Sequence, residues 1–264
     1  MRQQIPNFFT LSNLFFGCCA MVLFLYGQPV SAAWCLLGSF LCDYSDGMVA
    51  RALRVSSPMG KELDSLADVV SFGVVPGVML YSMLSGVYCE SLSVGFTFYP
   101  PLSAPFPAGA PQDLPQHLPL CPAALPAFIL SIFSAYRLAK FNLDIRQKSY
   151  FIGLSTPGCT LFVLGLTLAV YNNQFGIGEF IQRAPWILYL LTGLFSFLLV
   201  SEIPMFALKF RSFRWQGNKM PYTFLVLGLT ALFTLKAIGM SVLIVFYVVL
   251  SLFFKHQITG LKKQ

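Results

Sequence analysis

Stretches of mainly apolar residues, each long enough to cross a lipid bilayer, follow one another along almost the whole sequence. A transmembrane helix needs about 20 such residues, because each residue adds about 1.5 Å of length and the hydrocarbon core is about 30 Å thick. Only 10% of the residues are charged, whereas a soluble domain carries about 25%. We therefore expect an all-α integral membrane protein. Eight candidate spans cover residues 8–26, 30–53, 63–86, 122–142, 156–172, 184–205, 222–237 and 238–254.

The positive charges indicate how these spans are oriented. When successive connections are assigned to alternate sides of the membrane, fifteen of the 17 Lys and Arg residues fall on one side, and only Arg183 and Lys236 fall on the other. Basic residues collect on cytoplasmic loops, so we expect an even number of spans with both termini in the cytoplasm. The net charge of +7 then reflects membrane orientation, and we expect no nucleic acid as a partner.

One connection on the outer side, at about residues 87–121, has an unusual composition. Nine of the chain's 17 Pro residues lie between Pro100 and Pro126, a range without Lys or Arg. Such a segment is typical of an extended or disordered loop rather than a helix. Cys89 and Cys121 lie at its two ends, and the sequence does not decide whether they form a disulfide.

Half of the acidic residues lie in one short part of this apolar chain. Five of the 10 Asp and Glu residues fall between Asp43 and Asp68, and four of them follow the spacing D-x2-D-G-x2-A-R-x8-G-x3-D-x3-D. Residues three, four, seven or eight positions apart share one face of a helix. Asp43 and Asp46 therefore share a face of one helix, and Asp64 and Asp68 share a face of the next. A Ser- and Pro-containing turn at residues 54–59 would make the two helices antiparallel neighbours, so that the four carboxylates converge near the cytosolic surface.

Four converging carboxylates would repel one another, and each is costly at membrane depth even alone. Two divalent cations would cancel their charge, and hard oxygen ligands suit Mg²⁺, Mn²⁺ or Ca²⁺. A paired metal site of this kind serves phosphoryl transfer, because it holds phosphate oxygens and activates a nucleophile. Helix caps or interfacial ion pairs are the structural alternative, which fits a single Asp better than four. A divalent-cation transporter is a remote functional alternative, because intramembrane carboxylates also mark ion paths.

The acidic run resembles, at every defining position, the signature of the CDP-alcohol phosphotransferases, which are membrane enzymes of phospholipid synthesis. The resemblance implies a core of six transmembrane helices, often dimeric, with a dinuclear metal site in a polar cavity at the cytosolic face. It also implies a reaction in which an alcohol replaces CMP on a CDP-linked lipid. The core corresponds to residues 1–220, and residues 221–264 add about two C-terminal spans and a basic tail.

Further segments resemble the bacterial and archaeal branch of this family that makes phosphatidylserine. They cover residues 5–17, 137–142, 151–157, 201–204 and 209–211, and Ser155 stands where that branch usually has Pro. The resemblance implies transfer of the phosphatidyl group of CDP-diacylglycerol to the hydroxyl of L-serine, at the cytosolic face of a bacterial or archaeal cytoplasmic membrane. The nearest alternative is the same chemistry with glycerol 3-phosphate or an inositol phosphate. Expected partners are thus CDP-diacylglycerol, L-serine, membrane lipids and a second copy of the chain, with two divalent cations as cofactors.

The resemblance also assigns roles to individual residues. Asp68 is the catalytic base that accepts the proton of the serine hydroxyl, and Arg51 offers a planar donor fork to a phosphate. Gly47 and Ala50 would let the nucleotide lie against the helix, although simple helix packing explains them too. The implied metal ligands are Asp43, Asp46, Asp64 and Asp68, and the implied CDP-lipid-binding residues are Asn13, Gly47, Ala50, Arg51 and Gly60.

Three polar residues near the cytosolic end of the fourth predicted span are candidates for the acceptor site: Arg137, Lys140 and Asn142. The two cations could bind the carboxylate of serine or a lipid phosphate. As an alternative, they are anchors whose charged ends reach the membrane interface. Thr10 lies one turn from Asn13, and it fits a site role and a hydrogen bond to its own helix equally well.

Overall fold

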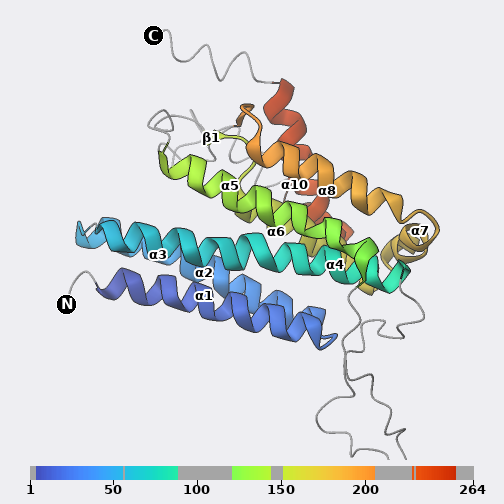
Figure 1. Ribbon diagram of the computed structural model, residues 1–264, viewed down its shortest axis with the longest axis horizontal. Helices are drawn as coiled ribbons and strands as arrows, with labels where there is room; N and C mark the ends of the chain where they lie inside the picture. The colour runs from blue at the N-terminus through green and yellow to red at the C-terminus, as the bar shows by residue number, and fades with distance from the viewer. Residues whose placement is uncertain are drawn as a thin grey trace, which may run out of the picture.

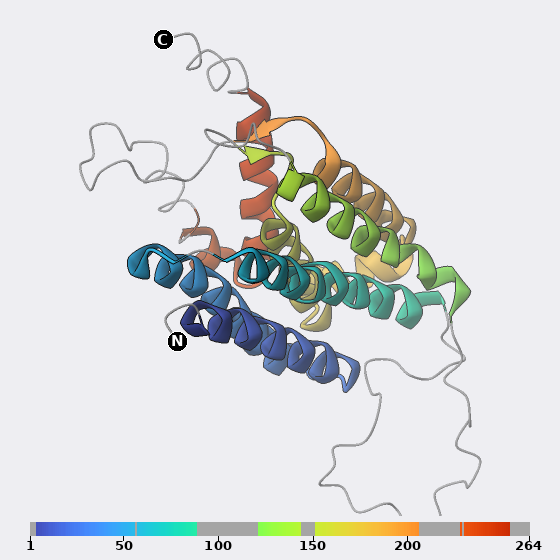
Figure 2. The same ribbon diagram turned by 60° about the vertical axis from the view of Figure 1, so that its left-hand side comes forward.

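The computed structural model describes residues 4–55, 57–88, 121–143, 151–205, 228 and 230–253. These residues are almost all helical, which confirms the predicted all-α class. Figures 1 and 2 show the helices gathered in one bundle, with most of the long axes running roughly side by side. Helices suit a lipid environment because each satisfies its own backbone hydrogen bonds.

The first two helices form an antiparallel pair at one edge of the bundle (Figure 1). α1 spans Gln4–Leu25 and α2 spans Pro29–Leu53. Gly27 joins them with a φ of 70°, a left-handed conformation that glycine adopts without steric strain. Because the helices are antiparallel, the polar residues near the start of α1 lie beside the C-terminal half of α2, which carries two of the Asp residues.

The next helical run extends without a break from Pro58 to Tyr88. Ser57 caps its start, since its Oγ accepts a hydrogen bond from the backbone nitrogen of Gly60 at 2.9 Å. A π-helical segment begins directly after Asp68, and such segments are rare and frequently found at functional sites. The run consists of α3 (Pro58–Asp68), η1 (Val69–Val74) and α4 (Val75–Tyr88).

Small polar residues attach two further helices to η1. Ser131 of α5 donates a hydrogen bond to the carbonyl oxygen of Gly73 at 2.9 Å, and Thr160 of α6 donates one to that of Phe72 at 3.0 Å. Most of α6 is buried, so this helix occupies the centre of the bundle. The elements here are η2 (Pro122–Phe128), α5 (Ile129–Leu143) and α6 (Thr156–Tyr171).

In the C-terminal part of the described chain, α10 packs on α6, whereas α8 packs mainly on α5. Ser241 of α10 donates a hydrogen bond to the carbonyl oxygen of Phe162 at 2.7 Å. Residues 230–235 are helical and lead into α10 through a turn. The elements are η3 (Gln174–Gly176), α7 (Ile177–Arg183), α8 (Trp186–Val200) and α10 (Ile238–Phe253).

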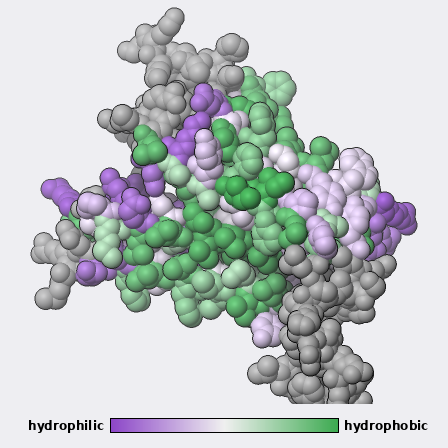
Figure 3. Space-filling view, in the orientation of Figure 1, coloured by the Kyte–Doolittle hydropathy of each residue, from purple (hydrophilic) through white to green (hydrophobic). Residues whose placement is uncertain are grey.

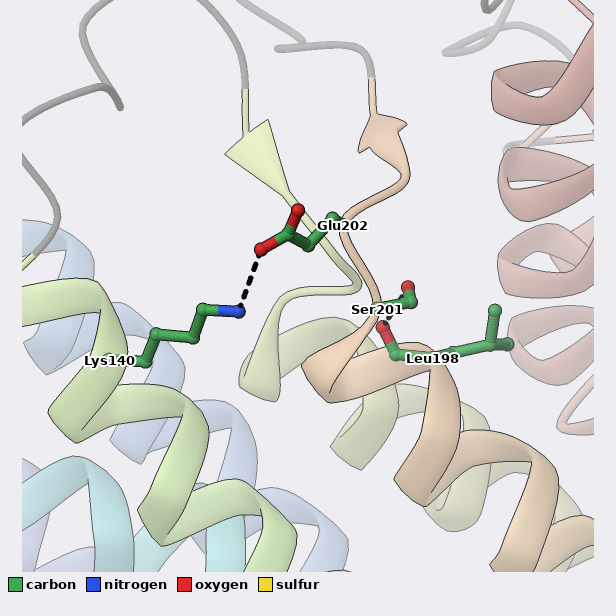
Figure 4. A network of polar contacts seen from close by, with 4 residues as sticks. All are labelled: Lys140, Leu198, Ser201 and Glu202. Carbon is green, nitrogen blue, oxygen red and sulfur yellow. Dashed lines mark hydrogen bonds and ion pairs between the residues drawn. The ribbon is translucent and has the colours of Figure 1, made fainter.

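A short strand pair ties the segments that follow α5 and α8 together. β1 (Phe151–Ile152) pairs antiparallel with β2 (Pro204–Met205). Beside this pair, Lys140 of α5 forms an ion pair with Glu202 (Figure 4). The distance between Lys140 Nζ and Glu202 Oε1 is 3.3 Å. Gly153 follows β1 with a φ of 73°, and a Cβ there would lie 2.8 Å from the carbonyl oxygen of Leu199, so the position needs glycine.

The described residues test only some of the predicted transmembrane spans. Three helical runs are long and apolar enough to cross a membrane, namely Gln4–Leu25, Pro58–Tyr88 and Pro122–Leu143. A pair bent by 105°, Thr156–Tyr171 with Gln174–Arg183, would form a fourth, and α8 and α10 are apolar but shorter. The predicted span 222–237 lies largely outside the described residues, so the expected number of eight stays a prediction.

The surface fits a lipid environment. Figure 3 shows a broad hydrophobic area across the middle of the molecule, with hydrophilic residues towards both ends of the helices. Large exposed apolar side chains on α1 and α2 include Phe8, Phe15 and Trp34. At the start of η2, Cys121 is disulfide-bonded, while Cys89 and most of the Pro-rich connection lie outside the described residues.

Candidate active site

The acidic residues lie near the turn between α2 and α3. α2 ends at Leu53, Arg54 adopts a left-handed φ of 52°, and Pro58 begins α3, so the chain reverses direction within a few residues. This is the turn that the sequence predicts. The first half of α1 completes the site, because side chains of all three helices line one cavity.

Three of the four predicted metal ligands form one group. Asp43, Asp64 and Asp68 can each place a carboxylate oxygen within 4.8 Å of the others. Oδ1 of Asp64 is buried and has no hydrogen-bond partner. A buried oxygen without a partner is costly, so this atom indicates that the group accommodates a ligand.

The fourth predicted ligand, Asp46, lies at the edge of this group. Its side chain is 8% exposed, and its Oδ2 accepts a hydrogen bond from Thr10 Oγ1 at 2.7 Å. Thr10 also donates to the carbonyl oxygen of Pro6 at 3.2 Å. Both interpretations of Thr10 are therefore realised, because it bonds to its own helix and to a site carboxylate.

Asn13 connects the carboxylates to three helices. The residue is fully buried, and its Nδ2 donates a hydrogen bond to Asp68 Oδ1 at 3.2 Å. Ser39 of α2 donates to the side-chain oxygen of Asn13, which fixes the orientation of the amide. Ser71 of η1 donates to the carbonyl oxygen of Asn13 at 3.2 Å. Asn13 is thus positioned to hold one oxygen of Asp68 in place.

The cavity between α1, α2 and α3 has a volume of about 460 Å³. Asp46 and Asp64 contribute carboxylates to its wall, and the exposed residues Arg51, Arg54 and Lys61 contribute cations. A cavity with both signs of charge suits an anion together with a metal ion. The full lining is Pro6, Asn7, Thr10, Asp46, Gly47, Ala50, Arg51, Arg54, Val55, Ser57, Gly60, Lys61 and Asp64.

Two glycines shape this cavity in different ways. A Cβ at Gly47 would meet only Arg51 Nη2, at 4.0 Å, so the absent side chain leaves open space on the cavity wall. A Cβ at Gly60 would lie 3.2 Å from Asn7 Oδ1, so this glycine allows the start of α1 to approach α3 closely. Gly47, Ala50, Arg51 and Gly60, all predicted to bind the CDP-lipid, line the same cavity.

The three acceptor candidates lie in different environments. Arg137 is 7% exposed, its Nε has no hydrogen-bond partner, and its guanidinium carbon lies 5.9 Å from the ring centroid of Phe141. The guanidinium also interacts electrostatically with Asp68. Lys140 instead forms the ion pair with Glu202, and Asn142 Nδ2 donates to Ser65 Oγ at 2.7 Å. Of the three, only Arg137 is a buried cation that lies near the carboxylate group.

Comparison with known proteins decides the family. Residues 3–99, which contain α1 to α4 and all four Asp residues, match the family model described as CDP-alcohol phosphatidyltransferase. A CDP-diacylglycerol--serine O-phosphatidyltransferase of Bacillus subtilis (strain 168) is 32% identical over 203 residues, which are 76% of this chain and 89% of that relative. The chain belongs to the CDP-alcohol phosphatidyltransferase family.

Other relatives that bear the same name are longer. One from Mycobacterium leprae (strain TN) is 30% identical over 210 residues, which are 77% of this chain and 58% of that protein. One from Saccharomyces cerevisiae (strain ATCC 204508 / S288c) is 30% identical over 199 residues, or 66% of this chain and 59% of that protein. The chain therefore spans less than two thirds of these two relatives.

The donor atoms fit the divalent cation on which CDP-alcohol phosphatidyltransferases generally depend. The group of Asp43, Asp64 and Asp68 offers only carboxylate oxygens, which Mg²⁺, Mn²⁺ and Ca²⁺ prefer over softer ligands. The unpartnered Oδ1 of Asp64 supports the same conclusion. In this family member, Asp43, Asp64 and Asp68 would hold a metal ion, with Asp46 next to them.

Sequence reasoning missed part of the cationic lining. From the sequence, Arg54 and Lys61 bear only on membrane orientation and Asn7 only on the family resemblance, yet all three line the cavity. Arg54 follows α2 directly and Lys61 lies in the first turn of α3. These positions are an available signal, because the turn between the two Asp-bearing helices must pass the carboxylates. Asn7 carried no such signal, because its contribution depends on how α1 packs.

Proposed function

We propose that the chain transfers the phosphatidyl group of CDP-diacylglycerol to the hydroxyl of L-serine and releases CMP. The observation that carries the proposal is a carboxylate group that has a cationic cavity on one side and the buried guanidinium of Arg137 on the other. The relatives named above support serine as the acceptor.

The cavity between α1, α2 and α3 would hold the cytidine diphosphate part of the lipid. Arg51, Arg54 and Lys61 supply positive charge for the two phosphates. Arg51 Nε donates to the carbonyl oxygen of Gly47 at 2.8 Å, which holds the guanidinium beside the open space at Gly47. This arrangement leaves the two terminal nitrogens of Arg51 for a phosphate.

Arg137 would hold the carboxylate of serine. A guanidinium matches a carboxylate with two parallel hydrogen bonds. Its burial and its unpartnered Nε mean that the site is costly when empty and gains from an anionic ligand. Arg137 interacts electrostatically with Asp68, so we expect a serine bound to Arg137 to lie close to the proposed base.

Asp68 would accept the proton of the serine hydroxyl. As that proton leaves, the serine oxygen forms a bond to the phosphorus attached to diacylglycerol, and the bond from phosphorus to the CMP oxygen breaks. CMP departs with the electron pair, and the cations of the cavity stabilise its charge. The hydrogen bond from Asn13 to Oδ1 orients the carboxylate of Asp68 for this role. A divalent cation, when bound, supplies positive charge to the phosphate oxygens.

An acceptor comparison tests this function. Purified protein receives CDP-diacylglycerol and Mg²⁺ or Mn²⁺ with L-serine, glycerol 3-phosphate or an inositol phosphate, and CMP release is measured. We expect release with L-serine that exceeds release with the phosphorylated acceptors at least tenfold. Release that depends on a phosphorylated acceptor and not on serine would overturn the choice of serine. Cation uptake by proteoliposomes without CDP-lipid would instead favour the transporter.

We also propose that both termini and the site face the cytosol of a bacterial or archaeal cytoplasmic membrane and that the protein is a homodimer. The uneven distribution of Lys and Arg supports this orientation. Labelling of single cysteines, introduced near each terminus, by a membrane-impermeant reagent in intact cells tests it. Strong labelling before the cells are opened would contradict the proposed orientation.

A further inference from the structure

We propose that Ser39 of α2 is a positioning residue for the reaction and that it acts on Asp68 through Asn13. In this proposal the Ser39 hydroxyl keeps the side-chain amide of Asn13 turned so that Nδ2 faces the carboxylate of Asp68. Ser39 is fully buried, lies outside the lining of the cavity between α1, α2 and α3, and precedes the acidic run of the sequence. The inference rests on the proposed function and deepens it, because it names a residue that controls the proposed base without touching a substrate.

The two ends of the Asn13 side chain form different hydrogen bonds. Nδ2 donates to Asp68 Oδ1 at 3.2 Å, and the side-chain oxygen accepts a hydrogen bond from Ser39 Oγ. An ionised carboxylate only accepts hydrogen bonds, so the nitrogen end of the amide is the end that can bond to Asp68. The oxygen end then faces Ser39, whose hydroxyl can donate to it. Both contacts therefore favour the same orientation of the amide.

Ser71 and Gly17 hold the backbone of Asn13 close to the helical run that carries Asp68. Ser71 lies three residues after Asp68, and its Oγ donates to the carbonyl oxygen of Asn13 at 3.2 Å. A Cβ on Gly17, one turn after Asn13, would clash with Ser71 Oγ, so the glycine permits this close approach. These contacts tie α1 to η1 beside Asp68 without a contribution from Ser39.

The terminal torsion of the Asn13 side chain is the freedom that Ser39 controls. This torsion of an asparagine is broad, so hydrogen bonds decide how the amide is turned. Ser39 Oγ also lies 3.3 Å from the carbonyl oxygen of Asn13, but its contact with the side-chain oxygen is the shorter of the two. Without the hydroxyl, the buried amide oxygen would lose this donor, and the amide would no longer be held at the angle that suits Asp68. A general base must lie within hydrogen-bond reach of the proton that it accepts, so a small displacement of its carboxylate slows the reaction.

Other serine hydroxyls of the bundle have a different kind of partner. Ser131 donates to the carbonyl oxygen of Gly73, and Ser241 donates to that of Phe162. Such bonds join one helix to the backbone of another, which is a structural role. Ser39 instead bonds to a side chain whose other end bonds to a carboxylate of the metal-binding group. This difference separates a positioning role from a purely structural one.

The test is Ser39→Ala, which removes only the hydroxyl. One lost hydrogen bond corresponds to roughly a fivefold to tenfold change in rate. With Mg²⁺ at saturation, we expect kcat for CMP release with L-serine to fall by about this factor, while the KM values for L-serine and CDP-diacylglycerol change less than twofold. An unchanged kcat would overturn the inference. If Ser39→Ala is unfolded at the assay temperature, Ser39→Cys replaces the hydroxyl by a weak donor and should show the same fall.

A matched control and a double variant separate positioning from packing. Ser241→Ala removes a hydroxyl that is buried to a similar degree, at 3% exposure, and that donates to a backbone carbonyl. It should leave kcat within twofold, and thermal unfolding checks that every variant is folded. In an Asn13→Ala background, Ser39→Ala should lower kcat by less than a further twofold, because residues that act through one another are not additive. An equal fall in Ser241→Ala, or a full additional fall in the Asn13→Ala background, would overturn the inference.

Failure of the proposed function has a separate signature. If the unchanged protein releases no CMP with any acceptor, the proposed function fails before a variant is compared. If it releases CMP only with a phosphorylated acceptor, the choice of serine fails, but the comparison of Ser39→Ala with Ser241→Ala is repeated with that acceptor. Asp68 would accept the proton of either hydroxyl, so the expected fall in kcat is the same.

Discussion

The two sides of the carboxylate group differ in exposure and in the number of their cations. The cavity between α1, α2 and α3 is lined by three exposed basic residues, Arg51, Arg54 and Lys61. The region between η1, α5, α6 and α10 has one buried guanidinium, that of Arg137, which is 7% exposed. One side is thus suited to a large ligand of high charge, and the other to a small ligand of low charge.

This difference indicates which part of the protein selects the acceptor substrate. Exposed cations attract phosphates broadly, and losing one of three costs little because solvent screens each charge. A buried guanidinium that lacks its ligand is left unsatisfied, so a wrong acceptor is penalised strongly. The exposed side lies within residues 3–99, which match the family model, whereas Arg137 lies beyond them. We infer that the N-terminal part provides the shared CDP-lipid chemistry and the later helices choose the acceptor.

The largest expected effect concerns the group that both sides share. Asp68→Asn removes the proposed base and one negative charge from the carboxylate group, so kcat should fall about 1,000-fold or more, within the range for general bases. CDP-lipid binding should remain detectable, because Asp68 does not line the cavity. Single-turnover CMP release measures the chemistry, and equilibrium binding of a labelled CDP-lipid measures the affinity.

Glu62→Gln is a matched control for this variant. Glu62 is an exposed carboxylate on the same helix, and it lies outside the group of three Asp residues. Its activity should stay within twofold of that of the unchanged protein. If Asp68→Asn instead lost CDP-lipid binding while it retained the chemistry, Asp68 would belong to the CDP-lipid site and the two-sided description would fail.

The next largest effects come from one substitution on each side of the carboxylate group, each measured for both substrates. Arg137→Lys keeps a positive charge but loses the planar fork, so the KM for L-serine should rise about 10- to 100-fold, the range for a buried charged hydrogen bond. Arg51→Gln should raise the KM for CDP-diacylglycerol only about threefold, because two exposed cations remain. Steady-state kinetics with each substrate varied in turn measures both. Equal effects on both substrates in either variant would contradict the division into two sides.

Much of the carboxylate group could be predicted because helix geometry is local. The spacing of Asp43, Asp64 and Asp68 along two helices joined by a short turn determines which faces they occupy, and the structure brings these three together. The burial of Arg137 could not be predicted, because it results from the packing of helices far apart in sequence. Sequence chemistry alone therefore does not distinguish Arg137 from Lys140, although only Arg137 is buried.

The smallest expected effect tests this last distinction. Lys140 Nζ lies 3.3 Å from Glu202 Oε1, with side-chain exposures of 36% and 67%. An exposed ion pair of this kind contributes about 0–1 kcal/mol, so Lys140→Gln should lower the free energy of unfolding by less than about 1 kcal/mol. The KM for L-serine should change less than twofold, because Lys140 is occupied by Glu202 rather than by the acceptor. A double-mutant cycle with Glu202→Gln, followed by thermal unfolding and serine kinetics, measures both quantities. A tenfold rise in the KM for serine would show that Lys140 reaches the acceptor, and selectivity would then no longer reside in the buried cation alone.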